Sequence, residues 1–121
     1  MSERLLPEQR VKQRKTIQNI FKKGKSAKGA FVNLWVYSDP ETSLSKPQLG
    51  VMVSKKTNDK SVKRNLWKRR IREIFRKNQA KIKKNSVVLV VTKKERIDPM
   101  PDYKTLEEEI FTLLSKTNSL K

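Results

Sequence analysis

The chain has 121 residues, which is enough for a single domain, residues 1–121, around one modest core. Its 30 Lys and Arg residues outnumber its 12 Asp and Glu residues, and the net charge of +18 predicts a polyanionic partner, nucleic acid above all. The lack of Cys and His excludes disulfides, thiolate metal sites and imidazole-dependent catalysis, and no apolar run approaches the roughly 20 residues of a membrane span.

The N-terminal part of the chain predicts a loose arm followed by a short helix. Residues 1–11 mix charged residues with Pro7, show no sustained period and lack the apolar segment of a signal peptide. We therefore expect a flexible arm and a cytoplasmic protein without a membrane anchor. Residues 12–23 predict a helix that ends at Gly24. Its apolar face carries Ile17, Ile20 and Phe21.

Three further segments predict β-strands. FVNLWVY, at 31–37, is rich in β-branched and aromatic residues, and the turn-forming cluster DPETSLSKP follows it at 39–47. QLGVMVS, at 48–54, predicts a second strand. SVVLVVT, at 86–92, is apolar on both faces, which is typical of a strand in the middle of a covered sheet.

Two more helices complete the predicted elements. A long basic helix is expected between Asn58 and Asn78, and a C-terminal helix is expected from about 102 to 117. The possible N-caps of the basic helix are Asn58, Asp59 and Ser61. On a helical wheel, an apolar stripe about 100° wide carries Trp67, Ile71, Ile74 and Phe75. The order of elements predicts an α+β fold in which three helices flank a small sheet.

The long helix has a cationic face opposite this stripe. That face carries Asn65, Lys68, Arg69, Arg72 and Arg76. Residues 54–77 contain 11 basic and 2 acidic side chains, a net charge of +9 (11 − 2). An ordinary solvated face would mix both signs to gain i,i+4 pairs, whereas only Glu73 offers compensation on this helix. Guanidinium groups suit phosphate oxygens because each can donate two parallel hydrogen bonds, so we expect a phosphate-binding face.

This region resembles a known family. SKK at 54–56, followed by VKRNLWKRRIREIFR at 62–76, is similar to the RNR motif of the protein subunit of bacterial ribonuclease P. FKKGKS at 21–26 is similar to the N-terminal signature of that family, and the resemblance extends from about residue 10 to 115. Leu66 departs from the pattern, because the family usually has a basic residue there. One phosphate contact is therefore expected to be absent, or to be replaced by Lys63 or Arg70.

The resemblance implies an RNA-binding subunit that assists endonucleolytic removal of the 5′ leader from precursor tRNA. In such an enzyme the catalytic centre and its Mg²⁺ belong to the RNA subunit, and the partners are ribonuclease P RNA and the leader. The resemblance also implies a protein that is monomeric within the ribonucleoprotein, with a mostly antiparallel sheet and a left-handed βαβ crossover like that of ribosomal protein S5 domain 2. The general rule favours right-handed crossovers. The expected RNA-binding residues are Lys55, Lys56, Lys63, Arg64, Asn65, Lys68, Arg69, Arg72 and Arg76.

The strand at 31–37 has an aliphatic side and an aromatic side. The aliphatic side, Val32, Leu34 and Val36, is the natural core face, and the other side carries Phe31, Asn33, Trp35 and Tyr37. The aromatic side is either a second core layer beneath a helix or a groove for unpaired bases, whose stacking contributes about 1–3 kcal/mol each. In proteins similar to this one, a cleft between the first helix and the sheet receives the leader. The residues expected there are Ile17, Phe21, Phe31 and Trp35, although relatives often carry Phe at the position of Ile17.

The acidic residues predict no catalytic or metal-binding site. The consecutive Glu107, Glu108 and Glu109 would point in three directions on a helix, so we expect a solvated face, and Asp98 and Asp102 suit turn and N-cap positions. A ribosomal or other structural RNA-binding protein without processing activity is the main alternative function. A DNA-binding module with a recognition helix is a second alternative, and a stand-alone nuclease is the least favoured by the sequence.

Overall fold

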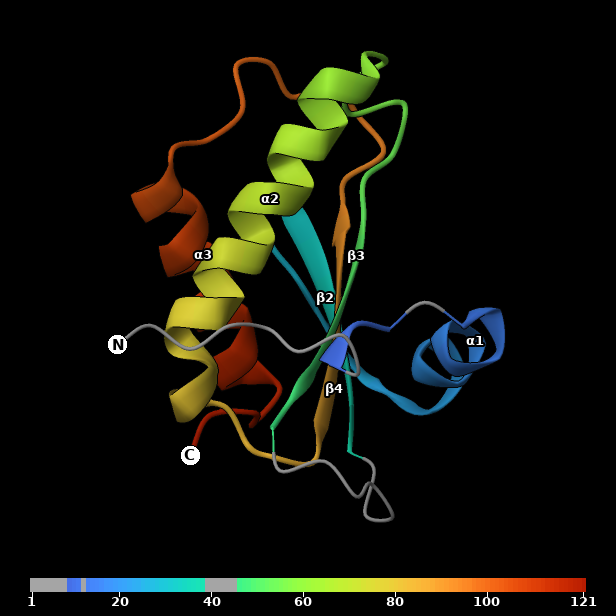
Figure 1. Cartoon of the computed structure of the whole chain (residues 1–121), viewed down its shortest axis with the longest axis vertical. Helices are drawn as coiled ribbons and strands as arrows, with labels where there is room; N and C mark the ends of the chain where they lie inside the picture. The colour runs from blue at the N-terminus through green and yellow to red at the C-terminus, as the bar shows by residue number, and fades with distance from the viewer. Residues whose placement is uncertain (1–8, 12, 39–45) are drawn as a thin grey trace.

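The structure, a computed structural model, describes residues 9–11, 13–38 and 46–121; residues 1–8, 12 and 39–45 lie outside the described part. Its elements follow the expected order, with one additional strand (Figure 1). They are α1 (Arg14–Lys23), β1 (Lys25–Lys28), β2 (Val32–Ser38), β3 (Gln48–Met52), α2 (Ser61–Asn78), the short 3₁₀ helix η2 (Gln79–Lys81), β4 (Ser86–Thr92) and α3 (Tyr103–Lys116). No helix of the described part is long and apolar enough to cross a bilayer.

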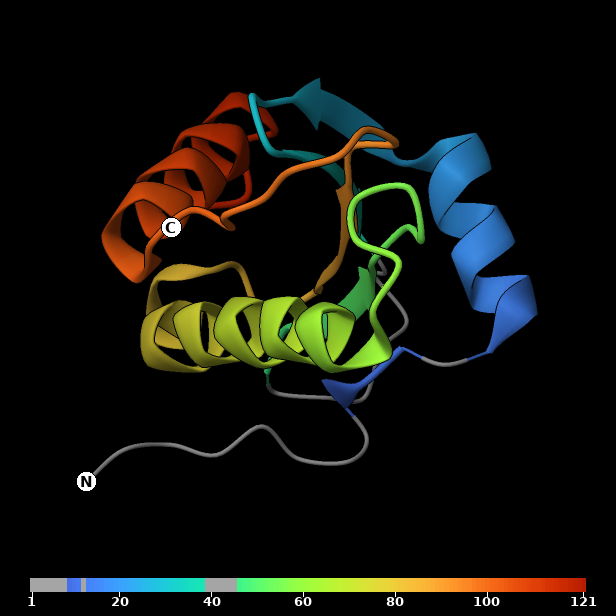
Figure 2. The same ribbon diagram turned by 90° about the horizontal axis from the view of Figure 1, so that it is seen from above.

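The strands form one sheet in the order β1-β2-β4-β3. The β1·β2 and β2·β4 pairs are antiparallel, and only β3·β4 is parallel, so the predicted α+β fold with a mostly antiparallel sheet is confirmed. In Figure 2 the two parallel strands rise toward the viewer, and the path from β3 through α2 to β4 turns clockwise. The crossover is therefore left-handed.

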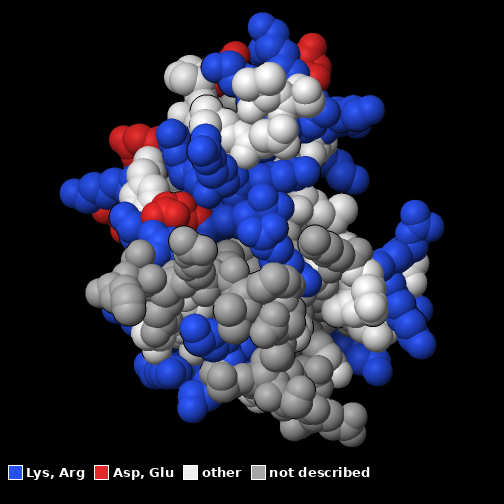
Figure 3. All heavy atoms as spheres, viewed as in Figure 1, with Lys and Arg blue, Asp and Glu red and all other residues white. Residues whose placement is uncertain are grey.

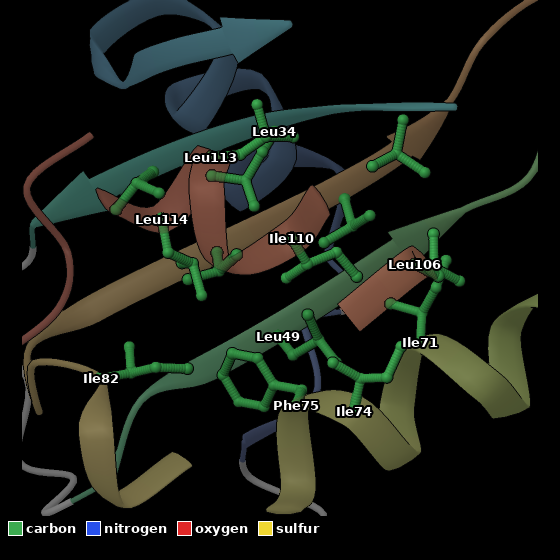
Figure 4. Packing of buried hydrophobic residues seen from close by; sticks show 14 of the residues in the cluster. Leu34, Leu49, Ile71, Ile74, Phe75, Ile82, Leu106, Ile110, Leu113 and Leu114 are labelled. Carbon is green, nitrogen blue, oxygen red and sulfur yellow. The ribbon is translucent and has the colours of Figure 1, made fainter. Parts of the chain in front are cut away.

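Helices cover both faces of the sheet. Figure 2 shows α2 and α3 on one face and α1 on the other. This arrangement explains why β4 is apolar on both sides: Val88 and Val90 pack in the core beneath α2 and α3, while Val87 and Leu89 pack with Ile20 of α1. Figure 4 shows the larger core, in which side chains from α2 and α3 meet those of the strands.

Residues 9–11 are not part of a loose arm. Gln9 is buried, and its Nε2 donates to the carbonyl oxygen of Pro47 at 2.8 Å and to Oε1 of Gln79 at 3.0 Å. Next to it, Arg10 pairs in parallel with Leu49 at the free edge of β3, and the amide of Val11 donates to the Leu49 carbonyl at 2.9 Å. Pro47, Gln79 and the free edge of β3 supply these partners, so the expected arm does not include residues 9–11.

The N-terminus of α2 differs from the expected caps. Lys60 occupies the N-cap position, with no side-chain capping bond, so Asn58, Asp59 and Ser61 are not the cap. Asn58 is buried instead, and its Oδ1 accepts from the amide of Lys60 at 3.0 Å, which forms a turn before the helix. In α3 the expectation is confirmed: Asp102 is the N-cap and accepts from the amide of Thr105 at 2.8 Å. That bond lowers the pKa of Asp102.

The glutamate run of α3 is not simply a solvated face. Glu109 accepts three backbone amides of the turn that precedes β2, from Ala30 at 2.6 Å, Phe31 at 2.9 Å and Val32 at 3.0 Å. Gly29 makes room for this carboxylate, since a Cβ there would lie 2.6 Å from Cδ of Glu109. The run therefore contains the residue that fastens the β1–β2 turn to α3. Glu107 also has a partner, since its Oε2 accepts from Nδ2 of Asn78 at 2.9 Å.

Candidate nucleic-acid interface

One flank of α2 is anchored in the core and the other is open to solvent. The apolar stripe predicted from the sequence is buried, with exposed fractions of 1% for Trp67, 0% for Ile71, 1% for Ile74 and 3% for Phe75. On the opposite flank, Lys63, Asn65 and Arg69 are exposed, while Lys68 and Arg72 are half-buried. Figure 3 shows Lys and Arg side chains gathered over this helix.

Four cations of this flank have no acidic partner among the residues that the structure describes: Lys63, Lys68, Arg69 and Arg72. Arg72 is also close to Arg10, which extends the positive surface from α2 to the segment beside β3. Burial, and then the charge of Arg10, lowers the pKa of Arg72. Such mutual repulsion is relieved when an anion binds between the guanidinium groups.

Other arginines of α2 have partners inside the protein. Arg64 donates through Nη1 to the carbonyls of Asn58 at 3.1 Å and Asp59 at 2.8 Å, so it holds the turn before the helix. Arg76 forms an ion pair with Glu73, one turn earlier on the helix. This bond raises the pKa of Arg76 and lowers that of Glu73. A phosphate would have to compete with Glu73 for Arg76, so Arg76 is a weaker candidate than Arg69.

Lys55 and Lys56 lie exposed in the segment that joins β3 to α2. This segment is held by the end of β4, because Oγ1 of Thr92 accepts from the amide of Ser54 at 2.9 Å and lies within hydrogen-bonding distance, 3.0 Å, of Oγ1 of Thr57. Thr57 is fully buried and also donates to the carbonyl of Lys93. The two lysines are therefore presented by an ordered loop next to the N-terminal end of the cationic flank.

The aromatic cluster lies between α1 and the sheet. The rings of Phe21 and Trp35 meet edge to face, with centroids 4.9 Å apart. Trp35 and Ile17 are half-buried against Ile20, Val87 and Leu89, whereas Phe21 is 42% exposed. The packing of the aromatic side beneath α1 is therefore confirmed. Part of the Phe21 ring remains exposed, and the groove for unpaired bases stays a prediction.

Phe31 does not belong to this cluster. It packs against the core beneath α2 and α3, on the opposite face of the sheet from Trp35. The reason is local: Phe31 precedes the first residue of β2, in the turn bound by Glu109, so strand alternation does not reach it. The residues that the structure brings together are Ile17, Phe21 and Trp35.

A row of side chains beside Trp35 was missed from the sequence. The strand register places Met52, Val91, Asn33 and Lys28 across all four strands on the face that carries Trp35. Met52 is 42% exposed, and Oδ1 of Asn33 is buried without a hydrogen-bond partner in the described part. Strand alternation places Asn33 on this face, but only the register identifies its neighbours.

Comparison with known proteins assigns the family. The sequence model of the Ribonuclease P family matches residues 5–118. The chain belongs to the ribonuclease P protein family. It is 30% identical over 118 residues to the ribonuclease P protein component of Pseudanabaena sp., covering 96% of this chain and 97% of that protein.

Solved structures agree with this assignment. The RNase P protein from Thermotoga maritima is 29% identical, with a TM-score of 0.76 over 88% of this chain and 96% of that one. The RNase P protein of Staphylococcus aureus is 25% identical, with a TM-score of 0.79 over 93% and 97% of the two chains. The fold predicted from the ribonuclease P resemblance is thus confirmed over most of the chain.

Several carboxylates of this ribonuclease P family member are engaged in structural contacts. Glu109 binds backbone amides, Glu73 pairs with Arg76, and Asp102 caps α3. Among the described residues, no three His, Cys, Asp or Glu side chains gather where they could share a metal ion. The donor set therefore does not fit a Mg²⁺ site made by the protein alone.

Proposed function

We propose that this protein is the RNA-binding subunit of the ribonuclease P ribonucleoprotein, and that it assists removal of the 5′ leader from precursor tRNA in the cytoplasm. The observation that carries the proposal is the cationic flank of α2: Lys63, Lys68, Arg69 and Arg72 have no acidic partner in the described part. The folded helix thus gathers these four cationic side chains on one surface before RNA binds. Closely spaced cations of one sign favour the binding of phosphates.

The protein acts by neutralising and positioning RNA, and the catalytic centre lies in the RNA subunit. Each cation that binds a phosphate of the ribonuclease P RNA releases condensed counterions and lowers the repulsion between RNA segments. Mg²⁺ would be held mainly by the RNA, because the described part of the protein offers no fitting donor set, and it would supply charge stabilisation for hydrolysis. One protein monomer in the assembly therefore reduces the Mg²⁺ concentration that the RNA requires.

The aromatic cluster binds the single-stranded leader. Phe21 offers an exposed ring and Trp35 a half-buried one, both suited to stacking on unpaired bases. Beside them, the exposed Lys28 can bind a phosphate. Ile17 adds an apolar contact. The cluster and the cationic flank belong to different elements, so one protein can contact the catalytic RNA and its substrate together.

Reconstitution tests this function. The purified protein, added to ribonuclease P RNA at limiting Mg²⁺, is expected to stimulate cleavage of precursor tRNA at least about tenfold, because protein cations replace Mg²⁺ in neutralising phosphates. Saturating Mg²⁺ should reduce the stimulation, which serves as the internal control. RNA binding without any stimulation would instead favour a structural RNA-binding protein without processing activity.

Trp35→Ala tests the leader site. We expect about tenfold weaker binding of precursor tRNA to the reconstituted enzyme, since one stacked base contributes about 1–3 kcal/mol, and an unchanged affinity for mature tRNA. Tyr37→Ala is the matched control, because Tyr37 packs in the same apolar cluster and its loss destabilises the protein without removing the Phe21–Trp35 pair. An equal loss of affinity for both tRNAs would show that Trp35 only stabilises the fold.

A further inference from the structure

The cationic flank of α2 has an apolar interruption. Val62 is 77% exposed and Leu66 is 38% exposed, one turn apart on a helix that otherwise presents charge. Exposed aliphatic side chains on a basic helix do not bind phosphate. They add a small apolar area to the flank, on which a ligand other than phosphate can pack.

Leu66 lies at the edge of a hollow between α2 and the segment that precedes α3. The hollow has a volume of about 220 Å³. Its lining includes Leu66 and Trp67 from α2 and Pro99 and Met100 from the facing segment. Pockets for drug-sized molecules measure about 300–1,000 Å³, so this hollow suits a smaller group, such as one flat ring system.

The polar groups of the hollow suit a nucleobase better than an anion. Trp67 is buried, and its Nε1–H has no hydrogen-bond partner in the described part, which is unfavourable for a buried donor. Asp98 also lines the hollow and carries a negative charge, paired with Arg96 at 3.2 Å. A carboxylate there disfavours a phosphate inside the hollow, whereas it can accept from the amino or imino group of a neutral base.

Two cationic side chains line the same hollow. Lys63 and Arg70 are part of its lining, and Arg70 is held in place because its Nη1 donates to the carbonyl of Pro101 at 2.8 Å. Lys63 and Leu66 also line the surface depression that contains Arg69 and Arg72. An RNA strand on the cationic flank would therefore pass directly over the opening.

We propose that this hollow receives one unpaired nucleobase of the bound RNA, while the flanking phosphates lie on Lys63 and Arg70. The base packs on the apolar lining formed by Leu66, Pro99 and Met100. This inference rests on the proposed function to the extent that it requires RNA on the cationic flank. It adds a base-binding site on α2, separate from the aromatic cluster beneath α1.

Tryptophan fluorescence provides a local test, because the chain has only two tryptophans. In a Trp35→Phe background, Trp67 is the only reporter. The full-length protein is titrated with a short unstructured RNA and with a ribose-phosphate strand of the same length that lacks bases, and saturation is checked by anisotropy. We expect the emission of Trp67 to fall at saturation with the base-bearing strand and to stay constant with the abasic strand.

Two charge-matched variants identify the hollow. Leu66→Arg adds a cation and fills the edge of the hollow, so the fluorescence response should be lost, whereas Val62→Arg adds the same charge on the same helix and should keep it, since Val62 does not line the hollow. Thermal melts establish that both variants fold. Equal responses of the two variants, equal quenching by the abasic strand, or no response at saturation would each overturn the proposal.

This result separates the inference from the proposed function. A base-dependent response of Trp67 without stimulation of ribonuclease P RNA would reject the function and keep the hollow. Stimulation of the RNA without a response of Trp67 would keep the function and reject the hollow. A protein that binds neither strand would contradict both.

Discussion

Glu109→Gln is expected to lower the stability of the protein by about 2 kcal/mol, or roughly 5–10 °C in Tm. The carboxylate accepts from the amides of Ala30, Phe31 and Val32, and it is the link between α3 and the turn that starts β2. A glutamine keeps the volume but replaces one acceptor oxygen by an NH₂ donor that faces backbone N–H groups. At least one of these amides, two of which are partly buried, then loses its carboxylate partner. Thermal unfolding followed by circular dichroism measures the effect.

Glu108→Gln is the matched control for this substitution. Glu108 is the neighbouring residue, is exposed, and has no side-chain hydrogen bond with the described residues. The same chemical change there should alter stability by less than about 0.5 kcal/mol. Similar losses for the two variants would mean that Glu109 acts only through the charge of α3 and that the three bonds to the turn contribute nothing.

Periodicity predicted the parts of the fold that depend on burial. The stripe of Trp67, Ile71, Ile74 and Phe75 is buried as expected, because these spacings place side chains on one face of any helix. The central place of β4 also followed from its sequence, since only a strand covered on both sides can be apolar on both sides. These predictions need no knowledge of which elements pack together.

The parts that depend on partners distant in sequence were not predictable. The strand β1, KSAK, has no apolar alternation and exists because its backbone pairs with β2. Gln9 is ordered by Pro47 and Gln79, which are 38 and 70 residues away in the chain. Glu109 binds a turn 77 to 79 residues earlier. Local sequence patterns carry no information about such pairings.

The candidate site was likewise predictable only in part. Charge spacing placed the cations of α2 on one flank, but it did not distinguish Arg69, which has no acidic partner in the described part, from Arg76, which is bound to Glu73. Alternation placed Trp35 correctly and Phe31 wrongly, because β2 begins one residue after Phe31. The site was predictable as a face of a helix and a face of a strand, and not as a set of individual contacts.

The combined substitution of Arg69 and Arg72 by Ala is expected to weaken binding to ribonuclease P RNA by about tenfold or more per arginine, the equivalent of roughly 1.4 kcal/mol each. Both guanidinium groups lie on the cationic flank, and neither has an ion pair within the described residues. Arg72 is half-buried, so a melt must show that the variant is folded under the conditions of the binding assay. Filter binding or anisotropy measures the dissociation constant.

The salt dependence of this binding tests the central claim, that the open flank of α2 binds RNA phosphates, most directly. The slope of log K against log of the salt concentration should become less steep by about 1.4–1.8 in the double variant, since each phosphate contact contributes about 0.7–0.9. Lys104→Ala with Lys116→Ala, on exposed positions of α3, removes the same charge and should leave the slope nearly unchanged. If the two double variants have equal slopes, net charge alone explains the affinity and α2 does not contact the RNA.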